Sequence, residues 1–242
     1  MKYFYILLAL FIISCKASKK EYTAQDIIDN CIINSGANKV SNANIAFKFR
    51  DKKYSAKRNK GLFNLTRSFD SIKDILSNNN FTRFAEGVEI KVADSMALKY
   101  ANSVNSVHYF SVLPFGLDDK AVHAKRLPSS TIKGKEYYKV EITFSEDGGG
   151  EDFEDVFIYW IGKEDFLIDY LAYAYHTNGG GKRFRALKEQ SNKKGIRFVD
   201  YDNYKPLNNS ISLIDIDQAF EENQLKKVSE IILEDIKVDI LN

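Results

Sequence analysis

Histidine, cysteine, proline and tryptophan are scarce in this chain of 242 residues, and the scarcity excludes several kinds of protein. The three histidines, His108, His123 and His176, lie far apart with no pair at metal-ligand spacing, so metal catalysis is not expected. No serine elbow and no nucleophilic cysteine with a partner histidine is present. We therefore expect no catalytic residue, no metal and no cofactor, and we do not expect an enzyme.

A strong charge of either sign is also missing. The formal net charge is +2, and it falls to +1 without residues 1–14, which contain one lysine. This balance gives no reason to expect nucleic acid as a partner. Only three prolines and no low-complexity linker interrupt a chain that is 44% hydrophobic and 13% aromatic, so residues 23–242 are expected to form a single β-rich domain.

The N-terminus has the pattern of a secretory signal. One lysine precedes an apolar run that is too short to span a bilayer and ends in Ile12-Ile13-Ser14-Cys15. This ending resembles the lipobox of bacterial lipoproteins and predicts a signal peptide over 1–14, lipidation of Cys15 and a tether over 15–22. The alternative is an ordinary cleaved signal with an incidental cysteine. With Cys15 lipidated, Cys31 has no partner for a disulfide and is expected to be buried on a helix.

The rest of the chain reads mainly as short strands. A capped helix is predicted from Thr23 to Gly36, up to six strands over 43–93, a second helix from Asp94 to about Val112, and a strand over 126–132. Five apolar runs over 136–205 predict an antiparallel meander. A short helix over 215–223 and one final strand over 225–240 complete the prediction.

Hairpin geometry places two glycine-rich breaks of the meander, 146–152 and 178–181, on one rim of the sheet. Charged side chains gather there, and they are the candidate rim site: Asp147, Glu151, Asp152, Asp155, His176, Lys182, Arg183 and Arg185. Three alternatives stay open, namely an ion-pair network that pins the loops, a cation site such as one for Ca²⁺, and a binding rim for a polar headgroup or glycan. Asp155 with His176 is the one acid and base pair to consider.

Two central strands of the meander are apolar on both faces, so the sheet is either covered twice or lines a cavity on one face. With the second helix, they supply the candidate cavity lining, which is Tyr100, Val104, Val107, Trp160, Tyr170 and Tyr173.

Several phrases carry a resemblance, among them 152–160, 169–173 and 178–185, together with 100–107 and 113–117. With the lipobox, they make the chain similar to an uncharacterised family of bacterial envelope lipoproteins, a domain of unknown function. The order of elements is also similar to the LolA and LolB lipoprotein carriers. That likeness implies a mainly β (α+β) fold: an open antiparallel half-barrel or strongly curved sheet, with two longer helices and one short helix packed on it.

These observations predict a lipoprotein of the cell envelope, anchored by lipid to the outer membrane and facing the periplasm. Lys16 stands where an aspartate retains some lipoproteins at the inner membrane. The expected function is non-enzymatic binding or carrying of a lipid or other amphipathic ligand. The alternatives are an interaction module of an envelope complex and, third, a hydrolase acting on an envelope or glycan substrate. Expected partners are the membrane and such a ligand or an envelope protein.

Overall fold

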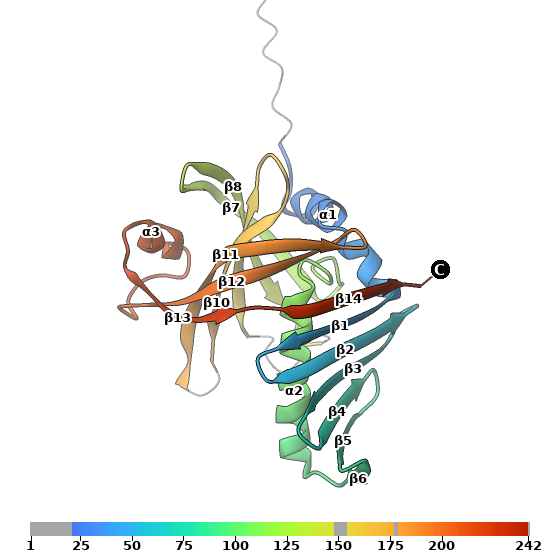
Figure 1. Cartoon of the computed structure of the whole chain (residues 1–242). Helices are drawn as coiled ribbons and strands as arrows, with labels where there is room; N and C mark the ends of the chain where they lie inside the picture. Colours follow the sequence, from blue (N-terminus) through green and yellow to red (C-terminus); the bar gives the residue numbers. More distant parts are fainter. Residues whose placement is uncertain (1–20, 148–153, 177–178, 242) are drawn as a thin grey trace, which may run out of the picture.

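The computed structural model describes residues 21–147, 154–176 and 179–241, and in them the chain forms two seven-stranded antiparallel sheets (Figure 1). The first sheet has the order β14-β1-β2-β3-β4-β5-β6. Its strands are β1 (Ala43–Phe49), β2 (Lys52–Asn59), β3 (Leu62–Phe69), β4 (Ile72–Ser77), β5 (Phe81–Ala85), β6 (Val88–Ile90) and β14 (Glu234–Ile240). The six strands predicted over 43–93 are confirmed.

The second sheet has the order β13-β12-β11-β10-β9-β8-β7 and contains the predicted meander. Its strands are β7 (Val122–Ile132), β8 (Lys135–Phe144), β9 (Val156–Gly162), β10 (Ile168–Tyr175), β11 (Gly181–Lys193), β12 (Ile196–Pro206) and β13 (Leu225–Ile231). The sheets do not close into a barrel. The predicted mainly β, open antiparallel fold is therefore confirmed.

Helix α1 (Ala24–Asn34) covers one face of the second sheet. Thr23 and Asp26 form a reciprocal capping box, with the Thr23 amide donating to Asp26 at 2.9 Å and the Asp26 amide donating to the Thr23 hydroxyl at 3.1 Å. The apolar stripe that includes Ile27, Ile28 and Cys31 is fully buried against the sheet. A short 3₁₀ helix, η1 (Ala37–Asn42), then leads into β1.

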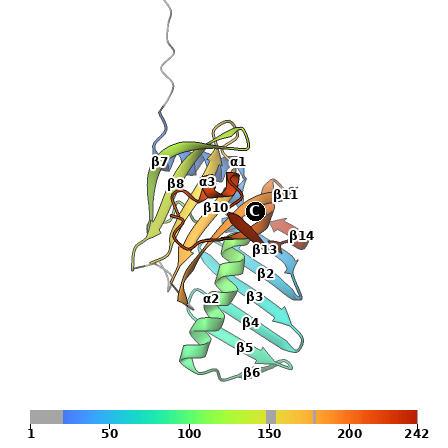
Figure 2. The same ribbon diagram turned by 90° about the vertical axis from the view of Figure 1, so that its left-hand side faces the viewer.

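Helix α2 (Asp94–Ser111) crosses the face of the first sheet (Figure 2). Val104 is fully buried against Ala56 and Leu65. Under the helix, Asp74 is completely buried between Arg67 and Arg83, each 2.6 Å from one of its oxygens. The two ion pairs compensate the cost of burying the carboxylate, and they join the neighbouring strands β3, β4 and β5 to one another beneath α2.

The second sheet is covered on both faces. One face packs on α1, and the other holds Trp160 beneath α3 (Ile216–Glu221). The Trp160 indole donates to Ser130 and to Asp217, both at 3.1 Å, and Lys139 pairs with Asp217 at 2.9 Å. Double coverage explains why the central strands are apolar on both sides.

The predicted single strand over 225–240 is wrong, because the chain changes sheets within it. β13 pairs with β12 of the second sheet, whereas β14 pairs with β1 of the first. At the crossing, the Leu233 amide donates to the Asp200 carboxylate at 2.8 Å instead of to a neighbouring strand. A single C-terminal segment therefore links both sheets. β7 also begins at Val122, four residues before the strand predicted over 126–132.

Candidate functional site

A cavity of about 460 Å³ lies between the C-terminal half of α2 and the inner face of the second sheet. β1 and the segment where β13 gives way to β14 complete its wall. Its apolar lining includes Phe110, Phe144, Phe157, Tyr173, Val199 and Ile231. Asn102, Asn105 and Ser106 of α2 and three charged residues, Asp155, Arg183 and Arg185, supply its polar groups. A mostly apolar pocket with a few polar groups is typical of a small-molecule site.

Strand register brings the two arginines to this cavity. Arg183 lies opposite Tyr173, which lies opposite Phe157 on the next strand. Two residues further along β11, Arg185 lies on the same face. Because side chains alternate along a strand, both arginines point to the face that carries the aromatic lining.

Arg185 is only 8% exposed and is surrounded by rings. Its guanidinium lies 3.8 Å from the centroid of the Phe110 ring and 5.3 Å from that of Tyr173. Nη2 donates to the Tyr173 hydroxyl at 3.2 Å. Nε is buried without a hydrogen-bond partner, and no carboxylate in the described residues pairs with this arginine. The fold therefore buries a positive charge at the cavity wall, and the described residues give it no negative partner.

The rim residues are brought to one end of the sheet, as hairpin parity predicts. Ala174 pairs with Val156 and Tyr175 with Gly181, so the breaks before β9 and after β10 share that end. Asp155 lies 3.6 Å from His176. Arg183 donates to the Lys182 carbonyl at 2.8 Å and lies over the Tyr175 ring.

The expected pairing of Asp155 with Arg183 or Arg185 is not among the ion pairs of the described residues, because Arg185 is turned to aromatic rings and Arg183 to its own backbone. Lys182 points away from the cavity and donates to the carbonyls of Asn209 and Ile211. Asp147 is exposed in a turn. Glu151, Asp152, glycines 148–150 and Cys15 lie outside the described residues.

The predicted cavity lining is placed in three different environments. Val107 and Tyr173 line the cavity. Tyr100 and Val104 instead pack toward the first sheet. The guanidinium carbon of Arg83 lies 3.5 Å from the centroid of the Tyr100 ring. Trp160 and Tyr170 lie in the core under α3, on the opposite face of the second sheet from Phe157 and Tyr159. Their assignment to the cavity is therefore corrected, since the period of two puts them on the other side.

Tyr109, Tyr159 and Tyr201, which the sequence interpretation did not single out, form or support the cavity wall. The Tyr109 and Tyr159 hydroxyls are 3.1 Å apart. Burial raises the pKa of Tyr109 and of Tyr201 to about 12 and that of Tyr159 further above its ordinary value. All three hydroxyls stay protonated at neutral pH, so they can donate hydrogen bonds but do not act as bases. Arg185 is the buried charge beside them.

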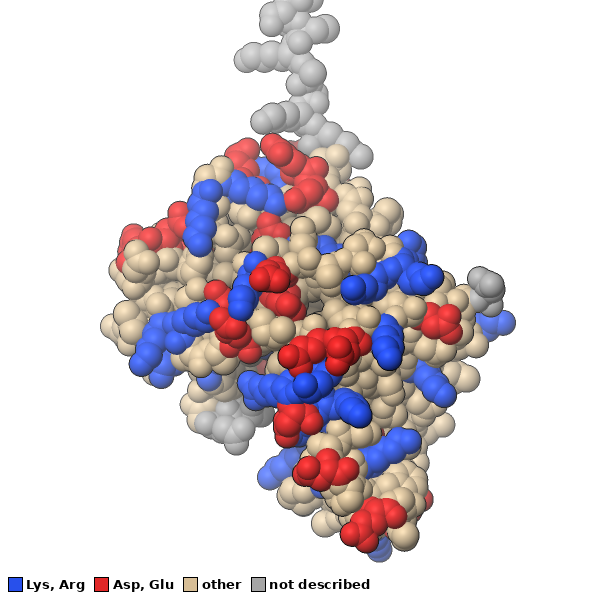
Figure 3. All heavy atoms as spheres, in the orientation of Figure 1, with Lys and Arg blue, Asp and Glu red and all other residues tan. Residues whose placement is uncertain are grey.

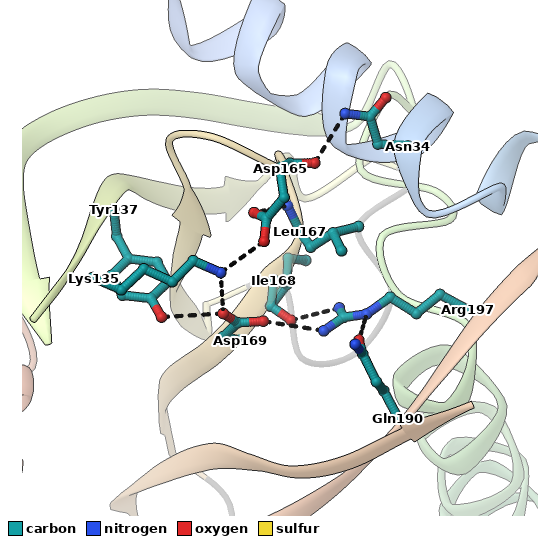
Figure 4. A network of polar contacts seen from close by, with 9 residues as sticks. All are labelled: Asn34, Lys135, Tyr137, Asp165, Leu167, Ile168, Asp169, Gln190 and Arg197. Atoms are coloured by element: carbon teal, nitrogen blue, oxygen red, sulfur yellow. Dashed lines mark hydrogen bonds and ion pairs between the residues drawn. The ribbon is translucent and has the colours of Figure 1, made fainter. Parts of the chain in front are cut away.

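A second polar cluster lies at the other end of the same sheet (Figure 4). Lys135 lies 2.7 Å from both Asp165 and Asp169, and Arg197 donates to Asp169 at 3.1 Å and to the Ile168 carbonyl at 2.7 Å. Two cations face two carboxylates here, and each finds its partners within the cluster. Nearby, burial raises the pKa of the Cys31 thiol to about 12, so it is not a nucleophile at neutral pH. This cluster holds hairpins together.

The described residues contain neither a group of three or more His, Cys, Asp and Glu side chains placed to hold a metal nor a helix long and apolar enough to cross a membrane. On the face shown in Figure 3, Lys and Arg side chains alternate with Asp and Glu. Ion pairs such as Lys188 with Glu230 and Lys227 with Asp202 interleave the two signs.

Comparison with known proteins gives likeness in fold. A DUF1329 family protein from Desulfovibrio piger superimposes with a TM-score of 0.56 at 10% identity, covering 90% of this chain and 93% of that one. A LolA superfamily protein from Nitrosomonas europaea gives a TM-score of 0.48 at 12% identity, covering 92% and 96%. None of the curated proteins matches. The model of one family matches residues 1–234, and the chain therefore belongs to the family of unknown function DUF6503.

Proposed function

We propose that this protein binds one lipid or other amphipathic molecule in the cavity between α2 and the second sheet. The observation that supports this most is the open space itself, of about 460 Å³, walled by aromatic and aliphatic side chains. This volume falls within the roughly 300–1,000 Å³ of ordinary ligand sites. On the other face of the sheet, Trp160 and Phe184 are fully buried and pack together.

Burial of apolar ligand surface would supply most of the binding free energy, at roughly 25 cal/mol per Å². The walls leave exposed some of the rings that a tail would cover, since Phe110 and Tyr173 are only partly buried although they pack on the core. Apolar walls with a few polar groups suit an amphipathic molecule, and binding without chemistry is the function that we propose for the cavity.

We further propose that the chain does this while held at the cell envelope by lipid on Cys15, facing the periplasm from the outer membrane. The support is the N-terminal pattern, with its lone lysine, short apolar run and Ile12-Ile13-Ser14-Cys15 ending. Acyl chains contribute roughly 0.8 kcal/mol per buried CH₂, so several on one residue hold a protein on a membrane.

The cavity proposal is tested with the full chain in a nonionic detergent and a diazirine-bearing hexadecanol. After illumination, mass spectrometry should find adducts on peptides that line the cavity, chiefly within 105–111 and 199–201. Val107→Trp should fill the space and reduce these adducts severalfold.

Leu98→Trp is the matched control, because Leu98 is on the same helix but 49% exposed and away from the cavity. Leu98→Trp should give as many adducts on the cavity peptides as the wild type. Both Leu98→Trp and Val107→Trp should unfold at the same temperature as the wild type. Adducts spread over the surface, or unchanged by Val107→Trp, would contradict ligand binding here and favour an interaction module of an envelope complex.

A further inference from the structure

The chemical class of the ligand is inferred from Arg185, which is buried without a carboxylate partner among the described residues. A buried charge costs several kcal/mol unless it is paired and hydrogen-bonded. Arg185 is 8% exposed, and its one side-chain hydrogen bond within the described residues is to a neutral tyrosine hydroxyl. The rings of Phe110 and Tyr173 stabilise the guanidinium by cation–π contact. They leave Nε without an acceptor in the described residues.

Of the three other arginines that are buried in the described residues, two meet carboxylates. Arg67 makes two hydrogen bonds to Asp74, of 3.0 and 2.6 Å, and Arg197 pairs with Asp169 at 3.1 Å. Arg58 is the exception, since it is buried over the Phe115 ring with Nη1 unpaired, but it does not line the cavity. Arg185 thus differs from the structural arginines in facing an open space instead of an acid.

Among the described residues that line the cavity, positive charge exceeds negative charge. Arg183 and Arg185 are the two cations, and Asp155, which lies 3.6 Å from His176, is the one carboxylate. Arginines two residues apart on one strand project from the same face of the sheet. Guanidinium groups match carboxylate and phosphate oxygens in geometry, and such charge-assisted hydrogen bonds are roughly twice as strong as neutral ones.

We propose that the amphiphile has an anionic head, a carboxylate or a phosphate, which Arg185 binds with help from Arg183 while the tail lies along Phe110, Phe157 and Val199. This inference rests on the proposed function of the cavity. The head supplies a negative partner for Arg185, which has none among the described residues, and the tail covers the apolar wall next to it. Because one tail and one head share a cavity of about 460 Å³, a single-chain amphiphile fits this arrangement.

The test is competition against the diazirine-bearing hexadecanol at one fixed detergent concentration, with the full chain. The competitors are palmitate, hexadecyl phosphate and hexadecanol, which share the tail and differ in the head. A charge-assisted hydrogen bond contributes about 1.5–3 kcal/mol, so an anionic competitor should displace the probe at a concentration about tenfold or more below that of hexadecanol. Whichever of palmitate and hexadecyl phosphate is stronger identifies the head.

Arg185→Gln should bring the anionic and neutral competitors to within about twofold of each other, as expected once the charged hydrogen bond is gone. Arg185→Lys keeps the positive charge but not the planar set of guanidinium N–H donors. It should retain part of the preference for the anionic competitors. Arg126→Gln is the control, because Arg126 hydrogen-bonds the Tyr22 carbonyl away from the cavity. It should keep the full preference.

The outcomes separate the two proposals. If all three competitors displace the probe equally from the wild-type chain, the anionic head is overturned while the cavity proposal stands. If none displaces it, the cavity proposal itself fails. Should Arg185→Gln not fold, the comparison of competitors on the wild-type chain still decides the question.

Discussion

Single residues show how this fold treats buried polar groups. Asp74 has two arginines, Lys139 has Asp217, and Arg197 has Asp169. His108 is buried on α2 with its Nε2–H donating to the Thr66 carbonyl at 3.0 Å, against the rings of Phe47 and Tyr54. Lys139 and Asp217 are 78 residues apart, and Arg197 and Asp169 are 28 residues apart. Such pairs are not visible in the sequence, where the same side chains look like the solvent-exposed positions of alternating strands.

His108 should make the stability of the protein depend on pH. Burial, assisted by the charge of Arg58, lowers the pKa of His108 from 6.5 to about 4. Between these pH values His108 is protonated in the unfolded chain but stays neutral in the folded chain. The free energy of unfolding therefore falls as pH drops from about 6.5 to about 4. The loss at this residue is on the order of 1–3 kcal/mol. Urea unfolding at several pH values measures it.

The matched variants are His108→Gln and His123→Gln, the second on an exposed side chain. Carboxylates that titrate over the same range are common to all three proteins. The wild-type advantage over His108→Gln should therefore shrink as pH drops through this window, whereas His123→Gln should run parallel to the wild type. If the free energy of unfolding varied with pH in parallel for all three proteins, His108 would not be the cause of the pH dependence.

Among the elements, local patterns predicted most of the helices and strands correctly. Thr23, Asp26 and the stripe behind them specify α1, and alternation with turn residues specifies β1 to β6. Hairpin parity also placed Asp155 and Arg183 at one end of the sheet. Two features were not predicted from the sequence. The change of sheet after Ile231 depends on pairing with β1, nearly 190 residues earlier, and the face of Trp160 depends on which side α3 covers.

The contact between the end of α1 and the β11–β12 hairpin is so close that the single methyl group of an alanine at position 36 should disrupt it. Gly36 follows α1 with φ of +70°, and a Cβ there would overlap the Gly195 carbonyl oxygen. The Arg197 amide donates to the Ser35 carbonyl at 2.8 Å beside it, which fixes the distance. Gly36→Ala should therefore lower the free energy of unfolding by several kcal/mol, in the range of about 1–3 kcal/mol for steric crowding added to about 1–2 kcal/mol for the left-handed backbone.

Gly87→Ala isolates the backbone contribution. Gly87 also has positive φ, +81°, but nothing lies within 4 Å of the position of an added Cβ. This variant should lose only about 1–2 kcal/mol in urea unfolding. Equal losses in the two variants would mean that the hairpin moves aside and that α1 is not held as closely as Gly36 and Gly195 indicate.

At the scale of the whole molecule, the two ends of the second sheet have different roles. The end with Phe166 contacts the start of the described chain, since the Tyr22 ring packs on Phe166 and Tyr138 at 5.2 and 5.9 Å. The other end carries Asp155, His176 and the cavity. In Figure 1 the described chain begins beside α1. β10, with eight residues between these ends, spans roughly 26 Å.

This geometry, with a lipidated Cys15, predicts that the cavity rim faces away from the anchoring membrane. The six residues 16–21 reach at most about 20 Å when fully extended, so the end of the sheet at Phe166 stays near the lipid surface and the rim stands further out. A ligand would then pass between the cavity and the periplasm or a partner there.

The measurement is fluorescence quenching in liposomes by a lipid with a spin-labelled headgroup. Fluorophores are placed at Glu164→Cys and at His176→Cys, both exposed, on opposite ends of β10. Cys31 is fully buried with its pKa raised to about 12, so it does not compete for the label. Quenching should be strong at position 164 and weak at 176, and Cys15→Ala should release both from the liposomes. Equal quenching at the two positions would place the rim at the membrane and make direct exchange with the anchoring bilayer the route of the ligand.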